Sequence, residues 1–234
     1  MAINAAIVIL GFWAPWIKAW GIGHRISLVE WLALQLSRSG TMSFALATTA
    51  VIIGGGILAF AGAVFRVWGS AYLGPGTVSN VNMVAGKVMA DGPYRLVRNP
   101  LYIGLWCMVA GMAILMPVTG ALFAVVLIAI FLTRLTLSEE AFLKEQLGDP
   151  YVVYLKAVPR LVPRLRGAPA QAGAKPHWLR AVLTELTPIG VLAGILVYSR
   201  NYDLALAGRV ILISFGASLV VRALLPGGIK ADQG

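Results

Sequence analysis

Two neighbouring acids, Glu139 and Glu140, follow directly after a long apolar stretch, and Arg134 lies on the preceding turns. Carboxylates beside a membrane are costly unless a cation or a hydroxyl group pairs with them. The pair therefore predicts a site for a polar ligand that carries cationic or hydroxyl groups. A solvated surface that follows the charge preference of a helix end is the alternative interpretation.

A second candidate segment covers residues 92–104, Gly-Pro-Tyr-Arg-Leu-Val-Arg-Asn-Pro-Leu-Tyr-Ile-Gly. Gly-Pro begins a turn, and Arg95 and Arg98 place charged donors at the mouth of the next apolar run. Tyr94 and Tyr102 supply flat aromatic faces that can hold a purine ring or a sulfonium cation. By itself, such a Gly-Pro-Tyr sequence is most often only a turn.

Asn99 and Pro100 open the apolar run that follows. Proline at the first turn of a helix loses no backbone hydrogen bond. The free N–H groups at such a helix start can bind a polar ligand.

A third candidate segment covers residues 148–154 and 158–163, which combine tyrosines, prolines and Arg160. A basic tail after a span is also typical of a membrane anchor on the cytoplasmic side.

The elements that must position these residues are membrane helices. Of the 234 residues, 59% are hydrophobic and 12% are charged, about half the roughly 25% charge of soluble domains. We predict an all-α, polytopic membrane protein with five or six spans, since each span needs about 20 apolar residues. The apolar runs cover residues 2–17, 42–64, 101–116, 118–132, 178–198 and 204–225.

Between these runs, we predict an interfacial helix over residues 24–38, a polar glycine-rich connection over 66–100 and a short amphipathic helix over 138–148. We therefore divide the whole chain into three predicted units. Residues 1–41 contain the first span, residues 42–168 form the core with the candidate site, and residues 169–234 form a linker and a helical hairpin.

Charge patterning predicts the sidedness. Lysine and arginine gather in residues 66–100 and 134–180, which places both segments in the cytoplasm. The turns near Pro117 and Asn201 then face outward. The net charge of +10 indicates anionic lipid headgroups rather than nucleic acid, because the basic residues lie between apolar runs. Cys107 is the single cysteine, so no Cys/His metal site is expected.

Taken in order, residues 92–104, Glu139–Glu140 and residues 151–163 resemble the isoprenylcysteine carboxyl methyltransferase and phospholipid methyltransferase superfamily. Residues 66–74 also resemble that family's approach to the cofactor region. The resemblance covers roughly residues 65–163. It implies a cytosolic S-adenosylmethionine pocket and a lipid-side tunnel for an apolar substrate.

The resemblance also implies roles for individual residues. It makes Arg134 and Glu140 catalytic, and it makes Arg98 and Arg134 substrate-binding. The cofactor-binding residues that it implies are Gly86, Lys87, Val88, Met89, Tyr94, Asn99, Pro100, Leu101, Tyr102 and Glu139.

Two positions depart from the family pattern. Asn99 stands where the family usually has histidine, and asparagine hydrogen-bonds but does not titrate near neutral pH. Arg134 is one place before the family's substrate arginine, and Leu135 occupies the matching place. One place on a helix is a rotation of about 100°.

Three functions follow as hypotheses. The first is methyl transfer from S-adenosylmethionine to a lipophilic small molecule or lipid, at the cytoplasmic face of a prokaryotic plasma membrane. The second is an NADPH-dependent sterol or steroid-type reductase, which Glu139 and Glu140 disfavour because acids repel the 2′-phosphate. The third is a non-enzymatic membrane module, although the spans carry few buried charges for an ion path. The C-terminal helices are candidates for a homodimer contact.

Overall fold

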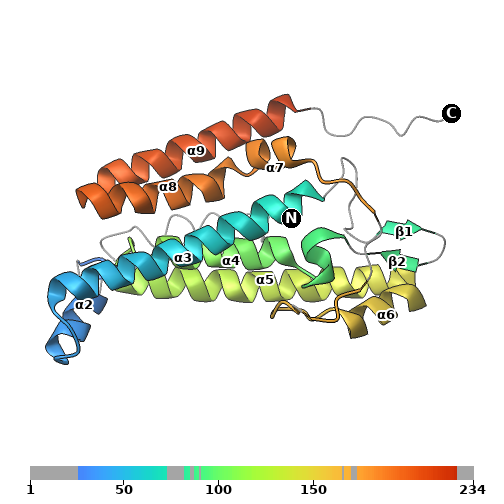
Figure 1. The fold of residues 1–234 in the computed structure, drawn as a ribbon, viewed down its shortest axis with the longest axis horizontal. Coiled ribbons are helices and arrows are strands. Elements are labelled where there is room, and N and C mark those ends of the chain that lie inside the picture. Colours follow the sequence, from blue (N-terminus) through green and yellow to red (C-terminus); the bar gives the residue numbers. More distant parts are fainter. Residues whose placement is uncertain are drawn as a thin grey trace.

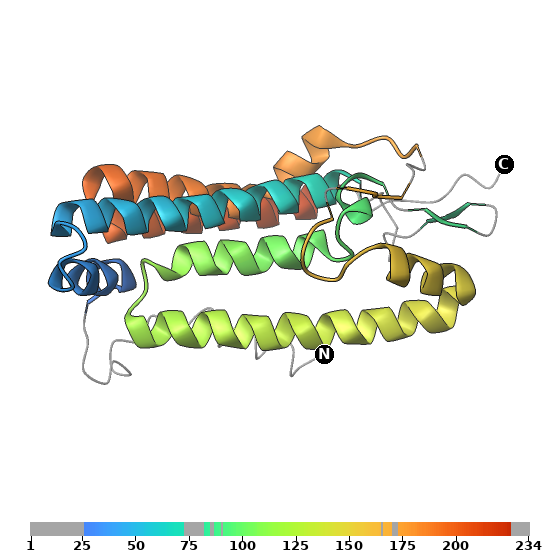
Figure 2. The same cartoon turned by 60° about the horizontal axis from the view of Figure 1, so that its bottom comes forward.

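The computed structural model describes residues 26–72, 82–84, 87–89, 91–164, 166–169 and 173–225. Over these residues, long helices run side by side and one small β-hairpin extends beyond them at one end (Figures 1 and 2). The predicted all-α membrane fold is confirmed, with the hairpin as a minor addition. The elements are α2 (Leu28–Arg38), α3 (Phe44–Ala71), β1 (Asn82–Val84), β2 (Lys87–Met89), the 3-10 turn η3 (Gly92–Arg95), α4 (Pro100–Ala113), α5 (Val118–Leu147), α6 (Asp149–Ala157), α7 (Trp178–Thr184), α8 (Leu186–Asn201) and α9 (Leu204–Leu224).

Polar caps fix where several of these helices begin. The Ser27 side chain accepts from the Glu30 amide, and the Glu30 carboxylate accepts from the Ser27 amide, which makes a capping box before α2. Ser43 and Asp203 cap α3 and α9 in the simpler way, by accepting one backbone N–H. Pro100 is the first residue of α4, as the sequence predicted.

Three helices, α3, α5 and α9, are long and apolar enough to cross a membrane. The pair α7 and α8 adds a fourth span if it counts as one, although the two helices meet at 63°. Helix α4 has 14 residues, fewer than the roughly 20 that a straight span needs. The described residues therefore give three or four spans where the sequence predicted five or six, and the predicted run 2–17 lies outside them.

Two predicted boundaries were wrong. The separate helix over residues 138–148 is the last part of α5, because no glycine or proline interrupts the chain between Gly120 and Gly148. Gly148 does end that helix, as predicted, with φ at 63° in the left-handed region that favours glycine. The polar connection also starts later than residue 66, since α3 continues to Ala71.

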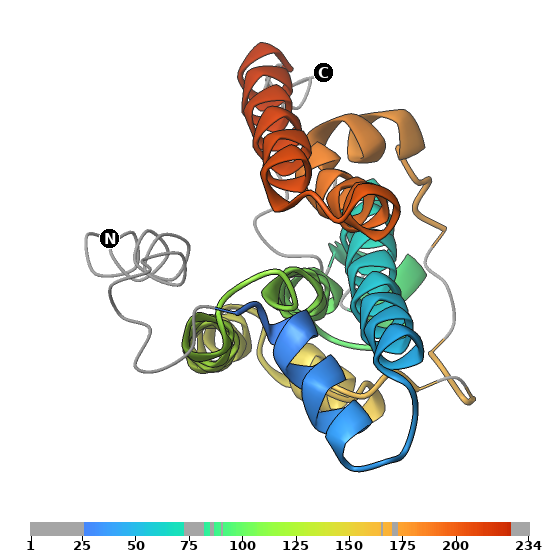
Figure 3. The same cartoon turned by 90° about the vertical axis from the view of Figure 1, so that its left-hand side faces the viewer.

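Helices α3 and α4 pack with their backbones in direct contact. A Cβ atom on Gly62 of α3 would lie 2.7 Å from the Met108 amide nitrogen and 2.9 Å from the Gly104 carbonyl oxygen of α4. A Cβ on Gly111 would lie 2.8 Å from the Ala59 amide nitrogen. Small residues allow membrane helices to approach this closely, and α3 and α4 lie next to each other when the bundle is viewed from its end (Figure 3).

We expect Gly62→Ala to lower the free energy of unfolding by about 1–3 kcal/mol, because the two backbones must move apart to admit the methyl group. The matched control is Gly54→Ala on the same helix, where a Cβ atom meets nothing within 4 Å. Both changes favour the helix by up to about 1 kcal/mol, so their difference isolates the packing cost. Thermal unfolding in detergent measures both. Equal melting temperatures for the two variants would contradict the packing account.

The two ends of the bundle are formed by different elements. The turn at Pro117, the turn at Tyr202 and helix α2 lie at one end, and η3, the hairpin, α6 and α7 lie at the other (Figure 1). The sequence grouped the turns near Pro117 and Asn201 on one side in the same way. Their outward orientation stays a prediction, as do the three-unit division of the chain and the interfacial position of α2.

Candidate active site

The three segments singled out in the sequence meet at the hairpin end of the bundle. The Tyr154 hydroxyl of α6 donates to the carbonyl oxygen of Tyr94 in η3 over 2.9 Å. The Arg98 amide donates to the Pro159 carbonyl oxygen over 3.0 Å. Glu140 of α5 joins them through ion pairs with arginines of the other two segments. Residues 40 to 60 positions apart in the chain thus form one polar cluster.

Glu140 lies at the centre of that cluster, with 8% of its surface exposed. Arg98 Nη1 donates to Oε1 over 3.0 Å, and Arg160 Nη2 donates to Oε2 over 2.6 Å. Arg98 also donates from Nε to the Val158 carbonyl oxygen over 2.6 Å, and from Nη2 to the Leu155 carbonyl oxygen. The cluster therefore ties α6 and the chain after it to α5.

A second contact joins α4 to α5. The Tyr102 hydroxyl donates to Glu139 Oε1, and the exposed Glu139 carboxylate makes no other hydrogen bond with the described residues. Asn99 is the N-cap residue of α4, and its carbonyl oxygen accepts from the Tyr102 amide over 3.1 Å. We call these three residues the Asn99–Tyr102–Glu139 group.

Asn99 carries an unused donor. Its Nδ2 atom is buried and has no hydrogen-bond partner among the described residues. A buried amide N–H without a partner costs about 1–3 kcal/mol, and such groups usually indicate an absent water or ligand. The group thus contains a carboxylate oxygen, a phenol ring and an amide donor that has no partner among the described residues.

The sequence of this region matches a known family model, phospholipid methyltransferase, over residues 50–150. We call residues 50–150, which make up fewer than half of the 234 residues, the family segment. The family segment contains the whole Asn99–Tyr102–Glu139 group together with Arg98 and Glu140. The resemblance found in the sequence is confirmed.

Two curated relatives are similar in sequence to part of this chain. The chain is 38% identical over 78 residues to the protein-S-isoprenylcysteine O-methyltransferase of Schizosaccharomyces pombe. The matched stretch covers 32% of this chain and 33% of the relative. It is 34% identical over 79 residues to protein-S-isoprenylcysteine O-methyltransferase B of Arabidopsis thaliana. This second match covers 33% of this chain and 40% of the relative. The matches thus span about a third to two fifths of the length of these relatives. No solved structure matches the chain significantly.

Within the family segment, Tyr94, Pro100 and Leu101 pack against the end of α3. Tyr94 is 2% exposed, and its hydroxyl donates to the Gly69 carbonyl oxygen over 3.4 Å. Pro100 is buried, and a Cβ atom on Gly69 would lie 2.7 Å from Leu101 Cδ2. These three residues therefore support the site from inside, and their predicted contact with a cofactor stays a prediction.

The tyrosines around the cluster are neutral at physiological pH. Burial, with help from the negative charge of Glu140, raises the pKa of Tyr151 to about 12. Burial also raises the pKa of Tyr94 and of Tyr154 well above the usual value. None of the three phenols can serve as a general base near pH 7, because each keeps its proton there.

The predicted strip over residues 86–89 is described only in part. Gly86 lies outside the described residues. Lys87, Val88 and Met89 form β2, which pairs antiparallel with β1 and approaches α6. The strip thus lies at the same end of the bundle as the Asn99–Tyr102–Glu139 group (Figure 2), and its cofactor contact stays a prediction.

The two predicted substrate arginines differ in their surroundings. Arg98 is held by Glu140 and two carbonyl oxygens, as described above. Arg134 is exposed on α5 and makes no hydrogen bond or ion pair with the described residues. Leu135, in the place of the family's substrate arginine, is partly buried. Of the two arginines, only Arg134 has its guanidinium open to an acidic ligand.

Sequence reasoning missed another buried acid, Glu185, at the bend between α7 and α8. It is 3% exposed and accepts from Arg66 Nε over 2.8 Å, from Arg66 Nη2 over 2.9 Å and from Ser70 Oγ over 2.7 Å. Arg222 Nη2 adds a longer contact of 3.3 Å. A lone carboxylate within the apolar run 178–198 was the sign that could have revealed it, since charges in spans pair with one another.

Proposed function

We propose that this chain is an integral membrane methyltransferase that moves a methyl group from S-adenosylmethionine to a lipophilic acceptor. One observation carries the proposal: the segment that matches the phospholipid methyltransferase family contains the complete Asn99–Tyr102–Glu139 group. The relatives' names indicate O-methylation of isoprenylcysteine. For this chain, the methyl donor, the acceptor and the activity are parts of the proposal.

The residues of the group fit S-adenosylmethionine. Glu139 can accept a hydrogen bond from a ribose hydroxyl or from the ammonium group, since only its Oε1 atom is engaged by Tyr102. The Tyr102 ring offers a π-face to a cation, and Asn99 Nδ2 can donate to a ring nitrogen or a carboxylate. The bound cofactor would supply an electrophilic methyl group on its sulfonium sulfur.

A carboxylate acceptor suits this site better than an amine. Its oxygen forms the new bond to the methyl carbon, the carbon–sulfur bond breaks, and the electron pair stays on sulfur. No proton moves in this step, so no general base is required. Asn99, which cannot titrate, is therefore compatible with ester formation, whereas a protonated amine would first have to lose a proton to a base.

We place the reaction at the cytoplasmic face of a prokaryotic plasma membrane. Basic residues gather around the site: Lys156 belongs to α6, Arg160 pairs with Glu140, and the Arg164 amide donates to the Leu96 carbonyl oxygen. Such accumulation favours the cytoplasmic side. The acceptor would then approach from the surrounding lipid.

Glu139→Gln should weaken binding of S-adenosylhomocysteine about tenfold to a hundredfold, because a hydrogen bond to a charged group is worth roughly 1.5–3 kcal/mol. Glutamine keeps an oxygen for the Tyr102 hydroxyl, so the packing between α4 and α5 is preserved. Isothermal titration in detergent measures the dissociation constant. The matched control is Glu145→Gln, an exposed acid six residues later on the same helix.

An unchanged affinity in Glu139→Gln would remove Glu139 from the cofactor site. The wild-type protein should also unfold at a higher temperature with S-adenosylhomocysteine, since a ligand at about 100 times its dissociation constant adds roughly 2.7 kcal/mol. Stabilisation by NADPH and not by S-adenosylhomocysteine would instead assign the chain to the reductases.

A further inference from the structure

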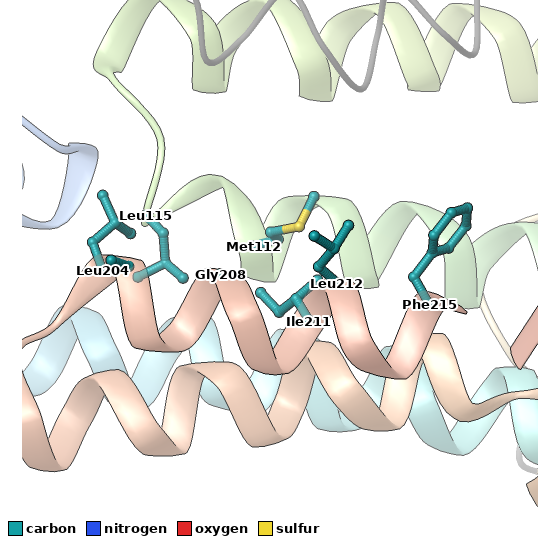
Figure 4. Close-up of a pocket in the computed structure, with 8 residues that line it drawn as sticks. Met112, Leu115, Leu204, Gly208, Ile211, Leu212 and Phe215 are labelled. Atoms are coloured by element: carbon teal, nitrogen blue, oxygen red, sulfur yellow. The ribbon is translucent and has the colours of Figure 1, made fainter. Parts of the chain in front are cut away.

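Helix α9 lies outside the family segment and forms an apolar groove with α4 (Figure 4). The groove has a volume of about 520 Å³. Its lining includes Met112, Leu115, Leu204, Gly208, Ile211 and Phe215. On α9 these residues recur every three or four positions, so they form a single row along one face of the helix. The groove is therefore shaped for one extended chain.

A second cavity with a polar end lies next to the groove. This cavity has a volume of about 230 Å³ and shares Met112 and Phe215 with the groove. Its lining also includes Arg66, Glu185 and Arg222. Together the two cavities fall within the roughly 300–1,000 Å³ that is usual for ligand sites. A row of apolar side chains thus leads to a cluster of charges.

The charged end carries an excess of positive charge. Two guanidinium groups, Arg66 and Arg222, face the single carboxylate of Glu185. Arg66 is held by two hydrogen bonds of 2.8 and 2.9 Å. The Arg222 side chain is 47% exposed, donates from Nε to the Thr184 carbonyl oxygen over 2.9 Å, and has an Nη1 group without a partner among the described residues. Arg222 can therefore bind an anion without losing its contact with the protein.

The dimensions match a long-chain lipid. Gly208 lies fourteen residues before Arg222 on α9, which corresponds to about 21 Å along the helix. The Arg222 side chain leans toward the start of the helix and so shortens this distance. An extended chain of eighteen carbons covers about 20 Å, taking about 3.6 Å for every three bonds. Such a chain reaches from the guanidinium to Gly208.

We propose that α9, α4 and the Arg66–Glu185–Arg222 cluster bind a long-chain carboxylate, with its tail in the groove and its head on Arg222. A guanidinium fork binds a planar carboxylate through two parallel hydrogen bonds, and the single row of lining residues fits one tail. Arg66 and α4 belong to the family segment, but α9 and Arg222 do not, so the proposed head position on Arg222 is distinct from the Asn99–Tyr102–Glu139 group.

Binding of radiolabelled stearate to the purified full-length protein in detergent tests this site. Gly208→Phe should weaken stearate binding at least tenfold, because a Cβ atom at Gly208 meets nothing within 4 Å and the ring would occupy the groove. The matched control is Gly216→Phe on the same helix, which also has open space around it and should bind stearate within twofold of wild type. Arg222→Gln should weaken stearate binding about tenfold, and methyl stearate should compete poorly with stearate in the wild-type protein.

Equal stearate binding by Gly208→Phe and wild type would overturn the proposal. So would equal competition by methyl stearate, which would show that the head is not recognised, or stronger competition by phosphatidylglycerol, which would indicate a two-chain lipid. Absence of stearate binding in the folded wild-type protein would assign the groove to protein side chains, either residues 3–16 of this chain or a second copy. S-adenosylhomocysteine affinity, measured in the same samples, tests the proposed methyltransferase separately.

Discussion

Replacing Glu185 by glutamine should lower the free energy of unfolding by about 3–5 kcal/mol, the usual cost of breaking a buried ion pair by removing one partner. The carboxylate is 3% exposed and accepts hydrogen bonds from Arg66, Ser70 and Arg222. Glutamine removes the negative charge and replaces one acceptor by a donor. The Arg66 guanidinium, whose side chain is 18% exposed, then remains charged without a counterion.

Thermal unfolding in detergent measures this effect, and we expect a decrease in melting temperature of roughly 10 °C or more. Arg222→Gln is the internal comparison: its contact with Glu185 is longer, at 3.3 Å, and its side chain is 47% exposed. Exposed pairs contribute about 0–1 kcal/mol, so this variant should unfold close to wild type. Similar losses in both variants would mean that Arg222 supports Glu185 as much as Arg66 does.

A double-mutant cycle isolates the ion pair. Arg66→Met with Glu185→Gln should be more stable than the sum of the two single losses predicts, because the double variant leaves no unpaired charge buried. Additive losses would show that Arg66 and Glu185 act independently, despite their two hydrogen bonds.

Glu140→Gln is expected to have an effect of similar size, about 3–5 kcal/mol. Its carboxylate is 8% exposed and is shared by Arg98 and Arg160. Because Arg98 also holds two carbonyl oxygens at the end of α6, loss of Glu140 should loosen α6 and the chain after it. Faster cleavage near residues 158–164 in limited proteolysis should accompany the lower melting temperature.

The same variant decides between two roles for Glu140. The sequence resemblance implies a catalytic role, whereas its contacts indicate that it positions α6. A stable Glu140→Gln protein without methyl transfer would favour the catalytic role, and a destabilised protein would favour the positioning role. The control is Glu145→Gln, because that acid is exposed on the same helix and has no ion pair among the described residues. Its melting temperature should equal that of wild type.

The sequence predicted the helical elements well where the free energy depends on local residues. Long apolar runs became α3, α5 and α9 because a buried backbone must satisfy its own hydrogen bonds. Pro100 and Gly148 marked helix ends through their own backbone preferences. The order of the three candidate segments was also sufficient to indicate the resemblance to the family whose model matches residues 50–150, since such a match depends on sequence alone.

Partners across the bundle were decided only by the tertiary structure. Arg66 and Glu185 are 119 residues apart, and no local pattern pairs them. Their meeting depends on how far α3 extends, on the rotation of each helix, and on the 63° bend at Glu185. The close approach of α3 and α4 at Gly62 fixes some of this geometry.

The dependence of ion pairing on the tertiary structure also explains why Arg98 and Glu140 have surroundings that the sequence did not predict. From the sequence, Arg98 was a candidate substrate-binding residue and Glu140 a candidate catalytic acid. Which charges neutralise one another depends on distances of about 3 Å between separate segments. The sequence by itself therefore determined the helices, the resemblance to the family and the candidate residues. Only the tertiary structure decided that Glu140 pairs with two arginines, while Glu139 makes a single hydrogen bond and Asn99 Nδ2 makes none among the described residues, because pairing is a property of packed helices and not of any one segment.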